Sequence, residues 1–276
     1  MKVYISVDME GISGISHVRY IMEDQAEYSR GRKLLMADLN AAIEGVIEAG
    51  AEEILVNDAH GSMRNVVVEE LHEKADLISG FPKQNAMMSG LDSTFNAALL
   101  VGYHARAHSW GVMAHSFNGR VFADIKINGI SYGETGISAA LAGYYKVPVV
   151  MVSGDDILAR EVMQILPHVK TAVVKKRVSA FAAGLMNPKR TVDGIRAAAK
   201  AGVLNGNASA IFDPGRNLQT EITLKEVLQA DVAESIPGVE RGGERQIRFP
   251  AKDIIEVNKL IETISNACCV LYMGLY

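Results

Sequence analysis

Two acidic residues follow the first apolar run of the chain. The run KVYISV (2–7) is rich in β-branched residues and predicts a strand, and Asp8 and Glu10 come directly after it. Side chains alternate across an extended backbone, so residues 8 and 10 leave on the same side if the strand continues. Two neighbouring carboxylates repel each other unless something cationic holds them. The pair therefore predicts a site for a cation.

Two further apolar runs also end in groups that can bind metals. These groups are Asn57, Asp58 and His60 after the run at 53–57, and His104 after the run at 98–102. In an open parallel sheet, sites form beyond the carboxyl ends of the strands. Three different strands are therefore expected to deliver carboxylate or imidazole groups to one edge of the sheet.

A predicted β-hairpin precedes a further acidic residue, Glu134. The stretch RVFADIKINGISYGE (120–134) alternates and contains Asn128-Gly129, the strongest short signal for a β-hairpin. It predicts an antiparallel excursion that delivers Glu134 just before a helix. His115 lies in GVMAHS, between the third strand and this hairpin.

Each of these residues has an ordinary structural explanation when it is taken alone. A single histidine is more often structural or solvated than a ligand, and an acid after a strand often caps a helix. Five such residues at strand ends or in loops that face one edge favour a metal site instead. Imidazole and carboxylate groups without thiolates suit zinc or another borderline divalent ion.

The elements that must position these residues predict an α/β fold. Near-continuous apolar runs are typical of strands that are covered on both faces. Apolar residues recur at helical spacing between Leu35 and Ile47, and Gly50 follows where a helix cap is expected. A second helix, rich in small residues, is expected from Ser138 to Tyr145. The pattern predicts a three-layer fold with a mainly parallel sheet and helices on both faces.

The character of the chain changes after about residue 175. An alanine-rich helix near 191–202 precedes strands at EITL (221–224) and RQIRF (245–249), and an amphipathic helix covers 254–264. Strands and helices segregated in this way predict a smaller α+β lobe. We therefore expect a metal-binding α/β core over residues 1–175 and a second lobe with a C-terminal helix over residues 176–276.

Composition excludes several classes of protein. The 276 residues are 49% hydrophobic and 22% charged, which is close to the average for globular proteins and excludes disordered and fibrous classes. A net charge of -4 gives no general attraction to nucleic acid or to an anionic membrane. No apolar run approaches the roughly 20 residues that span a bilayer. A small or neutral partner is expected.

The N-terminal sequence and the cysteines bear on the cellular compartment of the protein. The first residues pass straight into a strand, so no secretory signal is expected. The two cysteines, Cys268 and Cys269, are adjacent and cannot link distant parts of the chain. A reducing cytoplasm is the simplest prediction.

An ordered set of short blocks resembles the D-aminopeptidase family. The blocks are SVDMEG (6–11), VNDAHG (56–61), DLISG (76–80), GYHARA (102–107), AHS (114–116), GETG (133–136) and GDD (154–156). They occur in the family's order and with similar spacing over about the first 160 residues. The last third of the chain matches more loosely.

The resemblance implies a binuclear zinc aminopeptidase that acts on short peptides or amino-acid amides with N-terminal D-amino acids. Five residues match the family's zinc-binding positions: Asp8, Glu10, His60, His104 and Glu134. Asp8 is the expected bridge between two zinc ions per subunit, and His115 matches a position with a catalytic role. The resemblance also implies a homo-oligomeric ring, in the characterised form a decamer of two stacked pentameric rings.

Two residues in the family blocks are candidates for substrate binding. Arg106 lies in GYHARA and Asp155 lies in GDD, and they would suit a substrate carboxylate or amine. The alternative is an ion pair between Arg106 and Asp155 that fixes two loops.

Two other functions remain open at this point. A binuclear phosphoesterase or amidohydrolase of another specificity would use the same kind of centre, since two metals also clamp phosphoryl groups. No GxxxxGK[ST] phosphate cradle occurs in the sequence. A non-catalytic, oligomeric metal-binding protein is the other alternative, and such a protein would have no need of His115 as a proton carrier.

Overall fold

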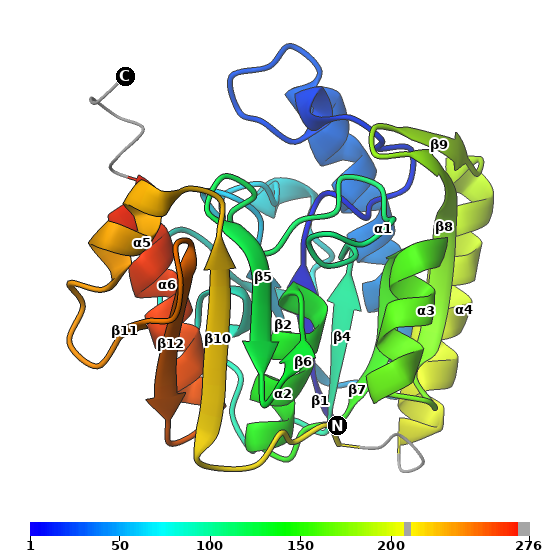
Figure 1. Cartoon of the computed structure of the whole chain (residues 1–276). Coiled ribbons are helices and arrows are strands. Elements are labelled where there is room, and N and C mark those ends of the chain that lie inside the picture. The colour runs from blue at the N-terminus through cyan, green and yellow to red at the C-terminus, as the bar shows by residue number, and fades with distance from the viewer. Residues whose placement is uncertain (207–210, 270–276) are drawn as a thin grey trace.

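A seven-stranded sheet lies at the centre of the protein (Figure 1). The computed structural model describes residues 1–206 and 211–269. The strands of this sheet are β1 (Lys2–Val7), β2 (Glu53–Asp58), β3 (Ala75–Ile78), β4 (Ala97–Val101), β7 (Val149–Asp155), β8 (Lys170–Ser179) and β9 (Ala182–Leu185). Their order is β3-β2-β1-β4-β7-β8-β9. All neighbours are parallel except β8 and β9, so the prediction of a mainly parallel sheet is confirmed.

Helices cover both faces of this sheet, as the apolar runs predict. Val3 and Ile5 of β1 pack in a core with helices α1 (Tyr28–Glu48) and α4 (Pro188–Leu204). The intervening Tyr4 faces the opposite core, which includes residues of α2 (Glu134–Tyr144) and α3 (Asp156–Ile165). This burial on both faces explains why the central strands are nearly continuous runs of apolar residues.

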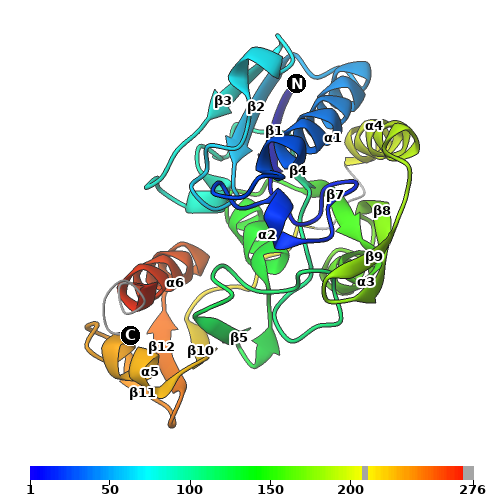
Figure 2. The same ribbon diagram turned by 90° about the horizontal axis from the view of Figure 1, so that it is seen from above.

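A second, antiparallel sheet has the order β11-β12-β10-β5-β6. Its elements are β5 (Phe122–Ile127), β6 (Ile130–Ser131), β10 (Leu218–Leu224), β11 (Glu240–Arg241) and β12 (Gln246–Ala251), with helices α5 (Val227–Ala233) and α6 (Ile254–Cys269). Figure 2 shows α2 between the two sheets, with α6 beside the second one. Residues of α2 are buried all along its length, which is typical of a helix enclosed on every side.

The predicted hairpin is present. Strands β5 and β6 pair in antiparallel fashion, and Asn128 and Gly129 both have positive φ angles, of 51° and 80°. These values are those of the tight turn that an Asn-Gly pair favours. Glu134 consequently begins α2, as expected.

The division into residues 1–175 and 176–276 stays a prediction. Its boundary would fall inside β8, and the second sheet takes β5 and β6 from the earlier part of the chain. The two sheets also share one continuous apolar core that includes α2 and α6. The second sheet therefore packs on the first part of the chain through buried contacts.

Three short 3-10 helices complete the elements that the structure describes, at Val18–Tyr20, Val68–Glu70 and Ala86–Met88. Among the helices of residues 1–206 and 211–269, none is both long and apolar enough to cross a membrane.

The strand order locates the functional edge. β1 lies between β2 and β4, and the order of the chain reverses between β1 and β4. A reversal of this kind leaves a crevice at the carboxyl ends of the two strands, where ligands bind in open α/β sheets.

Candidate metal centre and cleft

Asp8 and Glu10 lie at this reversal, just beyond the end of β1. Both residues are buried, with 2% and 3% of their surface exposed. His60 reaches them from the end of β2. Its Nδ1 atom lies 3.1 Å from Oδ1 of Asp8 and 3.0 Å from Oε2 of Glu10.

His104 and Glu134 approach Asp8 from the other side. Nε2 of His104, beyond the end of β4, lies 3.5 Å from Oδ2 of Asp8 and 3.1 Å from Oε2 of Glu134. The enclosed helix α2 places Glu134 in its first turn, and Oε1 of Glu134 accepts a hydrogen bond from the backbone N–H of Phe117 at 2.5 Å.

The five residues form two groups that share one member. Asp8, Glu10 and His60 offer ligand atoms within 4.8 Å of one another, and so do Asp8, His104 and Glu134. The two carboxylate oxygens of Asp8 point to different histidines. This arrangement is what a carboxylate between two ions requires.

His115 lies at the mouth of this centre. Its ring stacks on His104 with the centroids 4.2 Å apart and an interplanar angle of 10°. Nε2 lies 3.9 Å from Oε1 of Glu10 and 3.7 Å from Oε1 of Glu134. One quarter of the His115 side chain is exposed, against 1% for His104, so His115 is the imidazole that is more open to the cleft.

Backbone carbonyls fix the orientation of all three rings. Each histidine has one nitrogen that donates to a carbonyl oxygen: His60 to Ile21 at 3.0 Å, His104 to Ala105 at 3.0 Å, and His115 to Met113 at 2.9 Å. In a neutral ring, the other nitrogen, which faces the carboxylates, then carries no proton and presents its lone pair. Histidine ligands of metals usually show this second hydrogen bond.

The charges in the centre shift one another's pKa values. Burial raises the pKa of Asp8 to about 7, and the charge of Glu10 adds to the rise. Burial would also raise the pKa of Glu10, but His60 outweighs it and holds this pKa well below its usual range. Burial favours neutral histidines, yet Glu10 raises the pKa of His60 and Glu134 raises that of His104, both well above the ordinary value.

The donor set fits a metal ion. Oδ2 of Asp8 and Oε2 of Glu10 are buried oxygens that accept no hydrogen bond from the described residues. Buried polar atoms rarely stay unsatisfied, and carboxylate oxygens that face imidazole lone pairs require either protons or a cation between them. Oxygen and imidazole nitrogen donors with no thiolate suit zinc and its borderline neighbours.

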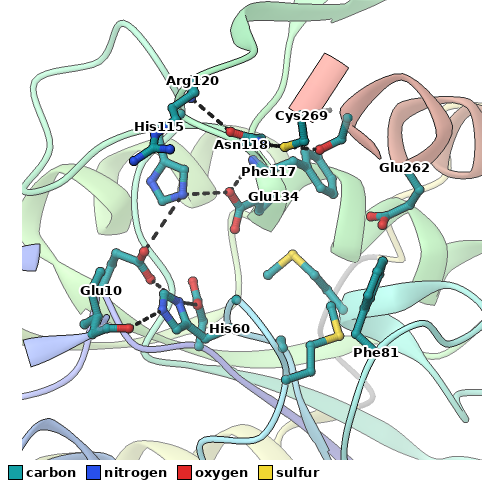
Figure 3. A pocket seen from close by; sticks show the side chains of 18 of the residues that line it. Glu10, His60, Phe81, His115, Phe117, Asn118, Arg120, Glu134, Glu262 and Cys269 are labelled. Carbon is teal, nitrogen blue, oxygen red and sulfur yellow. Dashed lines mark hydrogen bonds and ion pairs between the residues drawn. The ribbon is translucent and has the colours of Figure 1, made fainter. Parts of the chain in front are cut away.

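The centre opens into a cleft of about 810 Å³. One wall is apolar and includes Ile21, Met63, Phe81 and Met87. The opposite wall comes from the loop at 117–120 and from α6, as Figure 3 shows. A volume of this size is typical of sites for small molecules and short peptides.

Asn57 and Asp58, two of the strand-end residues considered above, make structural hydrogen bonds and do not join the metal centre. Asn57 donates to the backbone carbonyls of Ala86 and Met87. The carboxylate of Asp58 accepts hydrogen bonds from the backbone N–H groups of Asn65 and Val66 and holds the loop that follows His60. Both residues therefore shape the edge without joining the centre.

Arg106 and Asp155 are not among the described residues that line the cleft. Asp155 caps α3 by accepting from the N–H groups of Ile157 and Leu158, and its other oxygen accepts from Val112 at 2.6 Å. Arg106 donates to the carbonyl of its neighbour Ala107. The structure does not bring this pair to the five candidate ligands, and a substrate role for either residue stays a prediction.

Lys175 and Glu262 are among the charged residues near the centre that sequence reasoning missed. Lys175 is buried in β8 and contacts the loop that carries Glu10, and Glu262 reaches the cleft from α6. A lysine inside the apolar run TAVVKK was the available signal for the first. An acid next to buried Ile261 in an amphipathic helix gives only a weak signal for the second.

Comparisons with known proteins agree with this geometry. The family model described as D-aminopeptidase matches residues 1–263. A D-aminopeptidase from Bacillus subtilis (strain 168) is 40% identical over 259 residues, which are 93% of each protein. Among solved structures, the Zn-dependent D-aminopeptidase DppA from Bacillus subtilis, described as a self-compartmentalizing protease, superposes with a TM-score of 0.95, at 37% identity and over 98% of each chain. This chain belongs to the D-aminopeptidase family.

Proposed function

We propose that this protein is a zinc-dependent D-aminopeptidase that binds two ions through Asp8, Glu10, His60, His104 and Glu134. One observation carries the two-ion proposal: the two groups of ligand atoms share Asp8 and no other residue. We assign Glu10 and His60 to one ion and His104 and Glu134 to the other. Two close divalent ions generate a nucleophile from water at neutral pH and neutralise charge on the attacked oxygen.

We assign the proton transfers to His115. Its Nε2 atom faces Glu10 and Glu134, its Nδ1 atom donates to the carbonyl of Met113, and its ring is partly open to the cleft. An imidazole placed in this way can accept a proton from the nucleophile and return it to the departing amine. The stacked ring of His104 limits the tilt of His115 and keeps Nε2 aimed at the centre.

Substrate class follows from the family and from the cleft. The relatives described above are D-aminopeptidases, so we assign short peptides or amino-acid amides with an N-terminal D-residue. The apolar wall with Met63, Phe81 and Met87 can pack against a small apolar side chain.

The assembly is proposed on the same basis. The structural neighbour is described as a self-compartmentalizing protease. We therefore propose that this chain forms a closed homo-oligomer, with a decamer of two stacked pentameric rings as the form to test. The cytoplasmic location that the sequence predicts is a separate proposal.

One experiment tests the proposed reaction. Protein loaded with zinc is offered matched pairs of D- and L-amino-acid amides and dipeptides, together with a phosphate ester. The proposal expects turnover of the D-series and loss of turnover on chelation. Turnover confined to the phosphate ester would identify a phosphoesterase, and a zinc-loaded protein without any turnover would identify a non-catalytic metal-binding protein.

A further inference from the structure

Glu262 is a carboxylate in the cleft that holds the metal centre. It extends from α6 into this cleft, on a different side from Glu10 and His60, as Figure 3 shows. Among residues 1–206 and 211–269, none makes a hydrogen bond or an ion pair with it. Glu262 is partly buried, and a carboxylate that is partly withdrawn from water is stabilised by a cationic partner, so this position is expected to receive a cation.

The helix that carries Glu262 is tied to the metal centre. Nδ2 of Asn118 donates to Sγ of Cys269 at 2.7 Å and lies 3.4 Å from Oγ of Ser265, both on α6. The residue before Asn118 is Phe117, whose N–H group donates to Glu134. Neighbouring residues of one loop therefore contact Glu134 and the helix that carries Glu262, which ties the position of this helix to the metal centre.

The electrostatics of Glu262 favour a cation beside it. Burial raises its pKa to about 7, and the charge of Glu134 contributes to the rise. An ammonium group beside Glu262 would offset both effects, because it donates hydrogen bonds and carries the opposite charge.

An aminopeptidase must distinguish a free α-ammonium group from an acylated amine. The α-ammonium group is separated from the scissile carbonyl carbon by a single carbon, so its binding group must face the same cleft as the metal centre. We propose that Glu262 binds the free α-ammonium group of the substrate. This inference rests on the proposed function, and it assigns to the C-terminal helix the recognition of the substrate's N-terminus.

The test compares Glu262→Gln with Glu262→Asp and with a matched control, Glu73→Gln. Glutamine keeps the shape of the side chain and removes its charge, whereas aspartate keeps the charge on a shorter stem. Glu73 is exposed and is not among the described residues that line the cleft. Two readouts are used: steady-state hydrolysis of a D-amino-acid amide by the zinc-loaded enzyme, and calorimetric binding of the same amide to the metal-free protein, which does not depend on turnover.

The expected result for Glu262→Gln is a KM about 10- to 100-fold higher with a smaller change in kcat, since the amide oxygen still accepts a hydrogen bond but no longer carries the charge that pairs with the ammonium group. Binding to the metal-free protein should weaken by a similar factor, Glu262→Asp should restore part of it, and Glu73→Gln should match the wild type. Unchanged KM and unchanged binding in Glu262→Gln would overturn the inference. A wild-type enzyme that hydrolyses no amide would refute the proposed function, and the binding measurement would still decide whether Glu262 holds an amine.

Discussion

The side-chain ammonium group of Lys175 donates a hydrogen bond to the backbone carbonyl of Glu10 at 2.5 Å, although 165 positions separate the two residues. The same Nζ atom donates to the carbonyls of Ile12 and Ile15. Lys175 is 1% exposed, and burial lowers its pKa to about 8, against the opposing charges of Asp155 and other acids. The buried lysine thus holds the loop from which Glu10 reaches the centre.

Replacement of Lys175 by methionine is expected to destabilise the protein by about 2–5 kcal/mol, because three buried carbonyl groups lose their donor. Urea unfolding of the metal-free protein measures this change. Lys176→Met is the matched control, since Lys176 is the next residue of β8 and is exposed. Equal unfolding free energies for the two variants would show that the Lys175 contacts contribute no net stability.

Removal of Asp8 should affect metal binding differently from removal of His60. Asp8 belongs to both groups of ligand atoms, whereas His60 belongs to one. We expect Asp8→Ala to lose both ions on dialysis and His60→Ala to keep about one ion per chain. Elemental analysis of the dialysed proteins checks this difference. Retention of the same number of ions by the two variants would contradict a shared Asp8.

His115→Ala is expected to keep both ions and to lower kcat by about 10²- to 10⁴-fold, as the loss of a general acid and base does. The control is His168→Ala, which removes an exposed histidine. Metal content and turnover are measured on the same preparations. Full turnover with both ions would exclude the catalytic assignment. Loss of an ion would instead make His115 a ligand, together with Glu10 and His104.

Zinc binding should release protons near neutral pH. Glu10 and Glu134 raise the pKa values of His60 and His104 well above the ordinary value, despite the opposing effect of burial, so the metal-free rings hold protons there. Zinc needs neutral rings, and its affinity should therefore rise with pH and fall on acidification. Calorimetric titration in buffers of different ionisation enthalpy should give roughly one or more protons released per ion. Zinc binding without proton release would contradict protonated histidines in the metal-free centre.

Much of the fold could be predicted from local patterns. The strands β1, β2 and β4 and the Asn128-Gly129 turn were predictable, because apolar runs and turn residues act over a few positions. The gathering of strand-end residues followed from the rule that parallel strands share a carboxyl edge. The adjacency of β2, β1 and β4 then brings His60, Asp8 and His104 together.

The rest depends on contacts between distant segments. No local pattern shows that β5 and β6 join a sheet with β10 and β12, or that β9 turns back against β8. The same holds for side chains: Lys175 faces the Glu10 loop, and Glu262 faces the cleft, only because two sheets pack around α2. The alternation of side chains along a strand predicts on which face of the sheet a residue lies, but it does not predict which other segment covers that face.

The central claim is that two ions share Asp8, and anomalous diffraction at the zinc absorption edge tests it most directly. Crystals grown with zinc should show two peaks per chain. One should lie about 2.0–2.2 Å from donor atoms of Asp8, Glu10 and His60, and the other at similar distances from Asp8, His104 and Glu134. A single peak, or two peaks of which only one contacts Asp8, would contradict the claim.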